Sequence, residues 1–191
     1  MDKITRLQVF DFDDTLFRIP TYTSKIHIEA LGYGFADPYE FYDHEISLDE
    51  SLHNIQLISP VYDAWKEGKE DPSCMQLLIT HRVVEVEEAV MKVLDARNMS
   101  FDRIFILGRK TEKVDSMKEI IKVLPNLETI EIYEDSIDQI IRYQEFGNGY
   151  NNLLYLSKKP YLDIKIYIVD KSKMYRIENV KLSEKKRITL I

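Results

Sequence analysis

VFDFDDTLF, residues 9–17, closes an apolar run that begins at Leu7 and reads as a buried β-strand over residues 7–10. Side chains alternate along a strand, so this strand cannot continue past Asp13 without burying charge. Asp11 is therefore expected at the carboxyl end of the strand, and Asp13 on the turn that follows. Ligands of open α/β sheets bind at this edge, so the stretch predicts both a fold class and the position of a site.

The two carboxylates favour a bound cation and acid–base chemistry. Two carboxylates at one strand end repel each other, and a divalent cation relieves the repulsion because hard oxygen ligands suit Mg²⁺. One carboxylate can then attack a phosphorus atom while the other transfers a proton. A structural alternative is a solvated helix N-terminus in which Asp13 or Asp14 is the capping residue.

The remainder of the chain alternates strand-like apolar runs with segments of helical spacing. This alternation predicts an α/β protein with a Rossmann-like, doubly wound parallel sheet. Beyond residue 160 two alternating runs predict an appended antiparallel hairpin instead. The expected strands are residues 7–10, 75–79, 103–107, 129–133 and 153–156, the helices 83–97, 114–124 and 137–146 (ended by Gly147 and Gly149), and the hairpin 164–169 and 174–180.

Length and cysteine content limit the possible classes of protein. A chain of 191 residues is long enough for one α/β domain and short for two, so residues 1–191 are expected to form a single domain. Cys74 is the only cysteine, which excludes an intrachain disulfide and suits a reducing, cytoplasmic environment. The first residues lack a signal-peptide pattern, and no apolar run reaches the roughly 18 residues that span a bilayer, so no membrane association is expected.

The formal net charge of −7 is distributed unevenly. Residues 1–156 carry 29 acidic and 16 basic side chains, whereas residues 157–191 carry 4 acidic and 10 basic ones. The acidic body argues against DNA binding through a broad positive field. The basic tail either contacts phosphates or balances the charge of the body.

Two further expected strands end in residues suited to phosphate chemistry. Thr80 ends the strand in QLLITHR, where its hydroxyl group and the amides that follow it favour an anion; the structural alternative is a helix cap before Val83. Glu134 and Asp135 follow the strand over residues 129–133. A second carboxylate pair at the same sheet edge is hard to explain without a cation.

The chain resembles the haloacid dehalogenase (HAD) superfamily in the order of its strand-end residues: the pair Asp11 and Asp13, then Thr80, then the pair Glu134 and Asp135. The resemblance spans about residues 5–150. It implies that Asp11 is a nucleophile that forms an aspartyl-phosphate and that Asp13 is the general acid and base. QLLITHR resembles the second motif, with His81 in place of a glycine. The third motif requires a lysine beside the nucleophile; Lys113, at the expected start of a helix, is preferred.

The resemblance extends to a complete set of candidate residues. Lys118 is the second choice for the third motif, since five residues turn a helix by about 140° from Lys113, and Asp138 is a weaker metal candidate. The expected cofactor is Mg²⁺, held by Asp11, Asp135, the backbone carbonyl of Asp13, and Glu134 directly or through water. The candidate catalytic residues are Asp11, Asp13, Thr80 and Lys113; the candidate phosphate or substrate ligands are Thr15, His81, Arg82 and Lys118; the candidate metal ligands are Asp11, Asp13, Glu134 and Asp135.

Residues 18–73 are rich in aromatic side chains and lie where many HAD enzymes insert a cap. We expect a small lid there, whose aromatic residues either form a satellite core or stack on a base, and a hairpin with a basic tail over residues 160–191. TLFRIP, Trp65, LLITHR and IEIYED also resemble the HAD domain of Swiss Army Knife RNA-repair proteins, which implies action on RNA ends.

The expected activity is Mg²⁺-dependent hydrolysis of a phosphomonoester, acting on a nucleotide or on the terminal phosphate of RNA or DNA. The alternatives are a phosphatase of small metabolites and a non-catalytic binding module that retains the HAD fold.

Overall fold

The computed structural model describes residues 3–22, 24–156, 160–177 and 188–190. At its centre lies a seven-stranded sheet in the order β5–β4–β1–β6–β7–β8–β9. The strands from β5 to β7 are parallel to one another, and β8 and β9 extend the sheet in antiparallel fashion. The strands are β1 Arg6–Phe10, β4 Cys74–Thr80, β5 Arg103–Ile106, β6 Thr129–Glu134, β7 Asp163–Asp170, β8 Lys173–Ile177 and β9 Ile188–Leu190.

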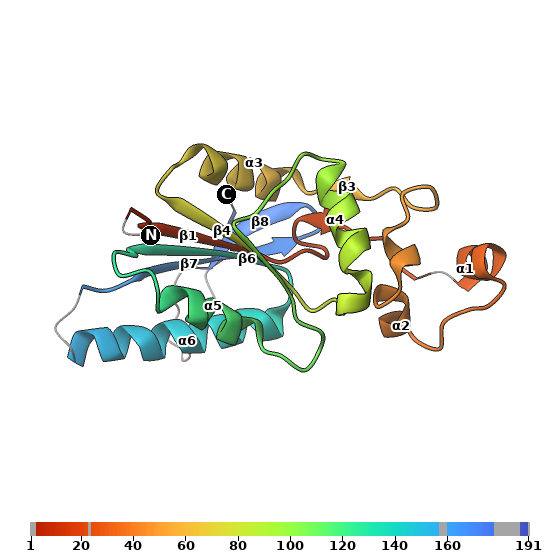
Figure 1. The fold of residues 1–191 in the computed structure, drawn as a ribbon. Coiled ribbons are helices and arrows are strands. Elements are labelled where there is room, and N and C mark those ends of the chain that lie inside the picture. The colour runs from red at the N-terminus through yellow and green to blue at the C-terminus, as the bar shows by residue number, and fades with distance from the viewer. Residues whose placement is uncertain (1–2, 23, 157–159, 178–187, 191) are drawn as a thin grey trace.

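Helices cover both faces of the sheet, as the α/β pattern predicts (Figure 1). One face packs against α3 (Ser59–Glu70) and α4 (Glu87–Asp95), the latter preceded by the 3₁₀ turn η2 (Val84–Val86). The other face packs against α5 (Lys113–Ile121) and α6 (Ile137–Leu156). Because strand side chains alternate, Phe10 belongs to the first core and Val9 to the second. Strands buried on both faces read as continuous apolar runs.

The register of the parallel strands decides which residues meet at the carboxyl edge. Phe10 of β1 pairs with Tyr133 of β6, and the two rings stack with centroids 4.6 Å apart. The residues that follow, Asp11 and Glu134, therefore lie side by side, on the α5 face of the sheet. The amide of Asp11 donates to the carbonyl of Tyr133 at 3.1 Å, which continues the ladder by one residue.

Two expectations about the C-terminal half are wrong. Residues 153–156 are not a strand but the last turn of α6, which runs through Gly147 and Gly149. Gly147 does not end the helix; it lies close to β7, where a Cβ would be 3.0 Å from Cδ1 of Ile164. The fifth parallel strand is instead β7.

The predicted hairpin is confirmed as the antiparallel pair β7–β8. Its predicted continuation over residues 178–180 lies outside the described residues, as do Lys158, Lys159 and residues 181–187 of the basic tail. Within the part of the chain that the structure describes, no helix is both long and apolar enough to cross a membrane.

A mostly helical insert, residues 19–55, lies between two short strands after β1. These strands, β2 (Phe17–Arg18) and β3 (Gln56–Leu57), pair with each other. The insert contains α1 (Ser24–Leu31), α2 (Pro38–Tyr42) and the 3₁₀ helix η1 (Glu45–Leu48), and α1 and α2 lie beyond the carboxyl ends of the parallel strands (Figure 1). Most of its aromatic rings build a small core around the buried Phe41, which contacts Tyr22 and Phe35.

Candidate active site

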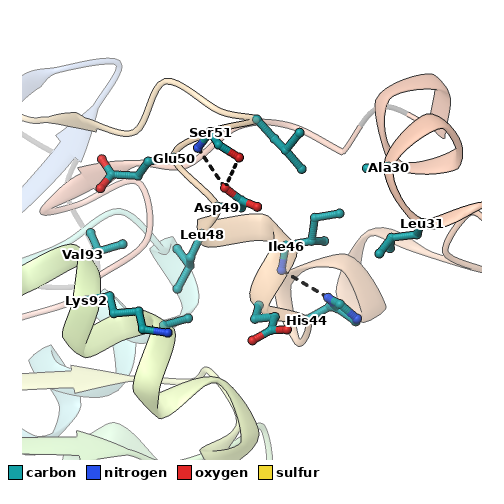
Figure 2. Close-up of a pocket in the computed structure, with 13 residues that line it drawn as sticks. Ala30, Leu31, His44, Ile46, Leu48, Asp49, Glu50, Ser51, Lys92 and Val93 are labelled. Carbon is teal, nitrogen blue, oxygen red and sulfur yellow. Dashed lines mark hydrogen bonds between the residues drawn. The ribbon is translucent and has the colours of Figure 1, made fainter.

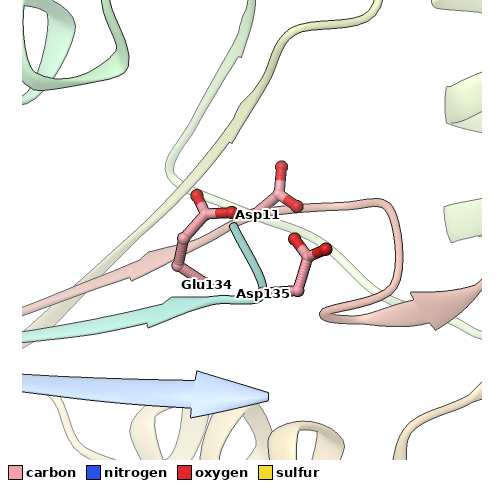
Figure 3. Close-up of side chains that lie close together, drawn as sticks. All are labelled: Asp11, Glu134 and Asp135. Carbon is pink, nitrogen blue, oxygen red and sulfur yellow. The ribbon is translucent and has the colours of Figure 1, made fainter. Parts of the chain in front are cut away.

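Three carboxylates converge where β1 and β6 end. Asp11, Glu134 and Asp135 each offer an oxygen, and these oxygens lie within 4.8 Å of one another. Figure 3 shows the three side chains pointing toward one another, Asp11 from the end of β1 and the acidic pair from the end of β6. Asp11 and Glu134 are buried and Asp135 is half-buried, so the sheet holds three acidic groups in a small, poorly solvated volume.

One ammonium group reaches this cluster. Lys113 is the first residue of α5, and its side chain is 3% exposed. It donates to Oδ1 of Asp11 at 2.6 Å and to Oε2 of Glu134 at 2.8 Å. The second oxygen of Glu134 accepts from the amide of Ser136 at 3.1 Å. Helix side chains lean toward the N-terminus, which is why a lysine in the first turn of α5 can reach over the sheet edge.

The electrostatics of the cluster show an excess of negative charge. Burial, together with the neighbouring Asp11 and Glu134, raises the pKa of Asp135 to about 9. Burial also raises the pKa of Asp11, although Lys113 opposes the shift. Burial alone would lower the pKa of Lys113, but Asp11 and Glu134 outweigh it and hold the pKa well above its usual value. A single lysine therefore does not neutralise the three acids.

Asp13 lies on the turn after β1 and is held by Arg82. The guanidinium group donates through Nε and Nη2 to Oδ1 of Asp13 at 3.0 and 2.6 Å. Nη1 of Arg82 donates to the carbonyl of Tyr42 at 2.7 Å and to the hydroxyl of Ser47 at 2.8 Å, both in the insert. Burial raises the pKa of Asp13, with Arg82 acting in the opposite direction. Asp14, the next residue, adopts a φ of 52° in the left-handed region that short polar residues tolerate.

The other predicted residues divide into those near the cluster and one that lies elsewhere. Thr15 is buried, and its hydroxyl donates to Oδ1 of Asp135 at 3.3 Å. Thr80 is buried at the end of β4, where its hydroxyl oxygen accepts from the amide of Arg82 at 3.2 Å. His81 bonds the carbonyl of Thr111 at 3.1 Å, and burial, reinforced by the nearby lysine, lowers the pKa of its imidazole.

Lys118 is not brought to the site. Its side chain is 43% exposed and pairs with Asp115 at 2.8 Å on the outer surface of α5. Asp138, the weaker metal candidate, is exposed in the first turn of α6. The angular offset of about 140° between Lys113 and Lys118 around α5 thus decides which lysine reaches Asp11.

A cavity of about 390 Å³ opens above the cluster. Asp11, Asp13, Lys113 and the acidic pair Glu134–Asp135 line it from the sheet edge. His81 and Arg82, both candidate substrate ligands, line it as well. The sequence did not point to the other lining residues as a set: Tyr39, Tyr42, Asp43, Arg109, Ser136 and Gln139. Arg109 follows β5 closely, so the rule that strand ends share one edge would have identified it.

A second cavity, of about 570 Å³, lies between α1, η1 and α4 (Figure 2). Its polar side chains already serve to cap turns. Nδ1 of His44 accepts from the amide of Ile46 at 3.2 Å, and Oδ1 of Asp49 accepts from the amide and hydroxyl of Ser51 at 2.8 and 2.6 Å (Figure 2). These groups are occupied within the chain, so the cavity at the sheet edge is the better candidate for chemistry.

Comparison with known proteins gives a likeness of fold. No family model matches the chain, and no curated protein matches it. Among solved structures the chain is similar to a chain in the structure of a Pnkp1/Rnl/Hen1 complex, with a TM-score of 0.53 and 16% sequence identity. The match covers 87% of this chain and 45% of that one, so the chain spans less than half the length of this neighbour. A likeness at this identity concerns the fold.

The residues at the sheet edge fit a divalent cation. Among the described residues, the lining of the cavity includes five carboxylates and three cationic side chains. Carboxylate oxygens are the ligands that hard divalent cations prefer. The raised pKa of Asp135 marks the position where positive charge is lacking. The buried acidic cluster is thus a candidate metal site.

Proposed function

We propose that this protein is a Mg²⁺-dependent phosphomonoester hydrolase that forms an aspartyl-phosphate on Asp11. One observation carries the proposal: Asp11 is held between Lys113 and the acidic pair Glu134–Asp135 on the floor of a cavity that Asp13 also lines. A nucleophile, a cation site and a second acid are thereby grouped around one volume in which a phosphoryl group fits.

The proposed metal site consists of Asp11, Asp135 and, directly or through water, Glu134. When bound there, a divalent cation would offset the negative charge that otherwise repels an anionic substrate from an anionic nucleophile. Thr15 orients Asp135 through its hydrogen bond, and Lys113 together with the amide of Ser136 orients Glu134.

The proposed reaction has two steps, each balanced by a proton transfer at Asp13. An oxygen of Asp11 attacks phosphorus; the bond from phosphorus to the ester oxygen breaks, and Asp13 donates its proton to the departing alcohol. A water molecule then attacks phosphorus and gives a proton to Asp13, and Asp11 is released together with inorganic phosphate. The raised pKa of Asp13 supports this role, since the first step needs the protonated acid.

Lys113 is proposed to stabilise charge rather than to transfer protons. The raised pKa of its amine keeps it positively charged. A fixed positive group 2.6 Å from the nucleophile holds the attacking oxygen in place and faces the charge that develops on the phosphoryl oxygens. Thr80 is proposed to bind a phosphoryl oxygen at the end of β4, as the motif resemblance implies.

The proposed substrate is a nucleotide or the terminal phosphate of a nucleic acid. The motif strings that resemble Swiss Army Knife RNA-repair proteins support this choice, and the likeness of fold to a chain of the Pnkp1/Rnl/Hen1 complex is compatible with it. The insert supports it as well, because it leaves an exposed tyrosine, Tyr39, at the cavity.

Turnover of p-nitrophenyl phosphate tests the proposed chemistry. Activity should require Mg²⁺ and disappear with EDTA. Asp13→Asn should slow turnover by roughly 10²- to 10⁴-fold, the scale of lost general acid–base catalysis. A folded wild-type protein with no Mg²⁺-dependent phosphatase activity on this compound, on mononucleotides, on sugar phosphates or on phosphorylated oligonucleotides would favour the non-catalytic binding module.

Two lysines on one helix provide a matched pair of variants. Lys113→Ala should lose most activity because it removes the only ammonium that contacts Asp11 among the described residues. Lys118→Ala should retain activity, since its ammonium group pairs with Asp115 and lies over the Phe146 ring rather than reaching Asp11. Equal losses in the two variants would contradict the assignment.

A further inference from the structure

Tyr39 and Arg109 form a fixed pair at the cavity above the acidic cluster. The guanidinium carbon of Arg109 lies 4.4 Å from the centroid of the Tyr39 ring, a cation–π contact. The same guanidinium donates to the carbonyl of Tyr39 and to Oδ2 of Asp43, each at 2.7 Å. Residues from the insert and from the loop after β5 are thus tied together on one side of the cavity.

The backbone that carries Tyr39 is also fixed. Asp37 caps α2, and its carboxylate accepts from the amides of Tyr39 and Glu40 at 2.7 and 3.0 Å. Yet Tyr39 is 63% exposed, whereas Phe41, two residues further on, is fully buried in the core of the insert. Single exposed aromatic residues are common. This ring differs because its position is fixed by Arg109 and it lines the same cavity as the acidic cluster.

The position of Asp13 determines where the leaving group would lie. A general acid must be within hydrogen-bonding reach of the departing oxygen, so the leaving group must occupy the volume beside Asp13. Asp13 and Tyr39 line one cavity of about 390 Å³, within the range of small-molecule sites. A neighbouring cavity of about 950 Å³ meets the cluster at Asp135 and is lined by Asp14. Asp13 does not line that larger cavity, so the volume beside Asp13 is the one that Tyr39 also lines.

The charge on this side of the cavity favours a flat, neutral group. The positive charge of Arg109 is matched by Asp43 at 2.7 Å, so the pair offers little net charge to a second phosphate. An aromatic ring backed by a guanidinium group instead suits stacking on a nucleobase, which tolerates all bases because each has a π face.

We propose that Tyr39, backed by Arg109, is the surface on which the nucleobase of the leaving nucleoside stacks, and that this residue determines the preference of the site for nucleoside phosphates. The inference rests on the proposed phosphatase function and deepens it, because it specifies the class of leaving group. Stacking of one base on an aromatic side chain corresponds to a preference of about tenfold or more.

The test compares substrates with and without a base in the wild type and in three variants. The substrates are adenosine monophosphate, as the 3′ and the 5′ isomer, and glycerol 2-phosphate, which has no base. The wild type should prefer at least one adenosine monophosphate, and Tyr39→Ala should reduce the ratio of the two kcat/KM values about tenfold or more, through KM, whereas Tyr39→Phe should keep it. Tyr33→Ala is the matched control, since Tyr33 is another exposed tyrosine of the insert, 53% accessible.

A binding experiment separates the failure of this inference from failure of the proposed function. Calorimetry with Asp11→Asn compares the affinity for adenosine monophosphate with that for inorganic phosphate, and needs no turnover. Tighter binding of the nucleotide that Tyr39→Ala removes in this background supports the stacking surface even if the wild type hydrolyses nothing. Equal affinity for the two ligands, or a nucleotide preference that survives Tyr39→Ala, would overturn it.

Discussion

Two clusters of buried charged residues lie on the same strands of the sheet and differ in their balance of acidic and basic groups. In the first, beneath α3, Glu131 of β6 accepts from Nη2 of Arg6 at 2.6 Å and from Gln8 at 3.1 Å, both on β1. Lys165 of β7 lies 3.4 Å from its other oxygen. In the second, at the carboxyl edge, Asp11, Glu134 and Asp135 share one ammonium group.

The pKa values express this difference. Burial tends to raise the pKa of Glu131, but the hydrogen bonds from Arg6 and Gln8 outweigh it and hold the pKa below its usual value. At the edge, burial and like charges raise the pKa of Asp135 to about 9. The first cluster is complete within the chain and is structural. The second has three acids and one ammonium group among the described residues, and this imbalance makes it the candidate functional site.

The largest expected effect is on turnover. Asp11→Asn should reduce phosphatase activity on the order of 10⁴-fold or more, because an amide cannot form the acyl-phosphate. The fold should persist, as checked by circular dichroism. Asp115→Asn, on the exposed surface of α5, is the control and should keep activity. Near-wild-type turnover by folded Asp11→Asn would refute the proposed mechanism.

A substitution in the cluster around Glu131 should lower the stability of the fold and leave turnover intact. Glu131→Gln leaves Arg6 without its buried carboxylate and should lower the free energy of unfolding by about 3 kcal/mol, the lower end of the range for breaking a buried ion pair. Turnover should survive at temperatures at which the variant is folded. Urea denaturation measures the first quantity and p-nitrophenyl phosphate the second. Loss of turnover without loss of stability would mean that the roles of the two clusters are reversed.

A smaller effect on the structural cluster is expected at Gly68, where α3 crosses β1. A Cβ there would lie 2.0 Å from Oε1 of Gln8 and 2.7 Å from Nε2 of Gln76. Gly68→Ala should therefore destabilise the fold by about 2 kcal/mol through overpacking. Gly149→Ala is the control: it also lies in a helix, has open space around it, and should stabilise the fold slightly. Equal denaturation midpoints in the two variants would contradict close packing of α3 on β1.

The smallest expected effect is a change in thermal stability at Asp135, and it tests directly whether the cluster at the carboxyl edge lacks positive charge. With EDTA present, Asp135→Asn should raise Tm by about 2–4 °C. A carboxyl whose pKa is raised to about 9 lowers the stability of the fold at neutral pH, and the neutral amide removes that cost; roughly 1 kcal/mol shifts Tm by this amount in a chain of this size. Mg²⁺ should raise the Tm of the wild type and have little effect on the variant. If Asp135→Asn instead lowers Tm without metal and still responds fully to Mg²⁺, the cation site lies elsewhere.

Much of the candidate site was predictable from the sequence, because the residues that follow buried strands can be recognised there. An apolar run that stops at a charged residue marks the end of a buried strand, and the ends of parallel strands share one edge of a sheet. Asp11, Thr80 and the pair Glu134–Asp135 are all identified by this rule. The prediction failed at residues 153–156, because α6 continues through Gly147 and Gly149 to Leu156 and does not end at the glycines.

The sequence by itself determined the alternation of strands and helices, the order of the strand-end residues and the excess of acids among them, since each depends only on local periodicity and on which residues follow an apolar run. Only the tertiary structure decided that Arg82 pairs with Asp13 across 69 positions and that Arg109 backs Tyr39 across 70. It also decided which lysine reaches Asp11. Such pairs join segments whose distance in space depends on the packing of the insert and α5 onto the sheet, and no local pattern encodes that distance.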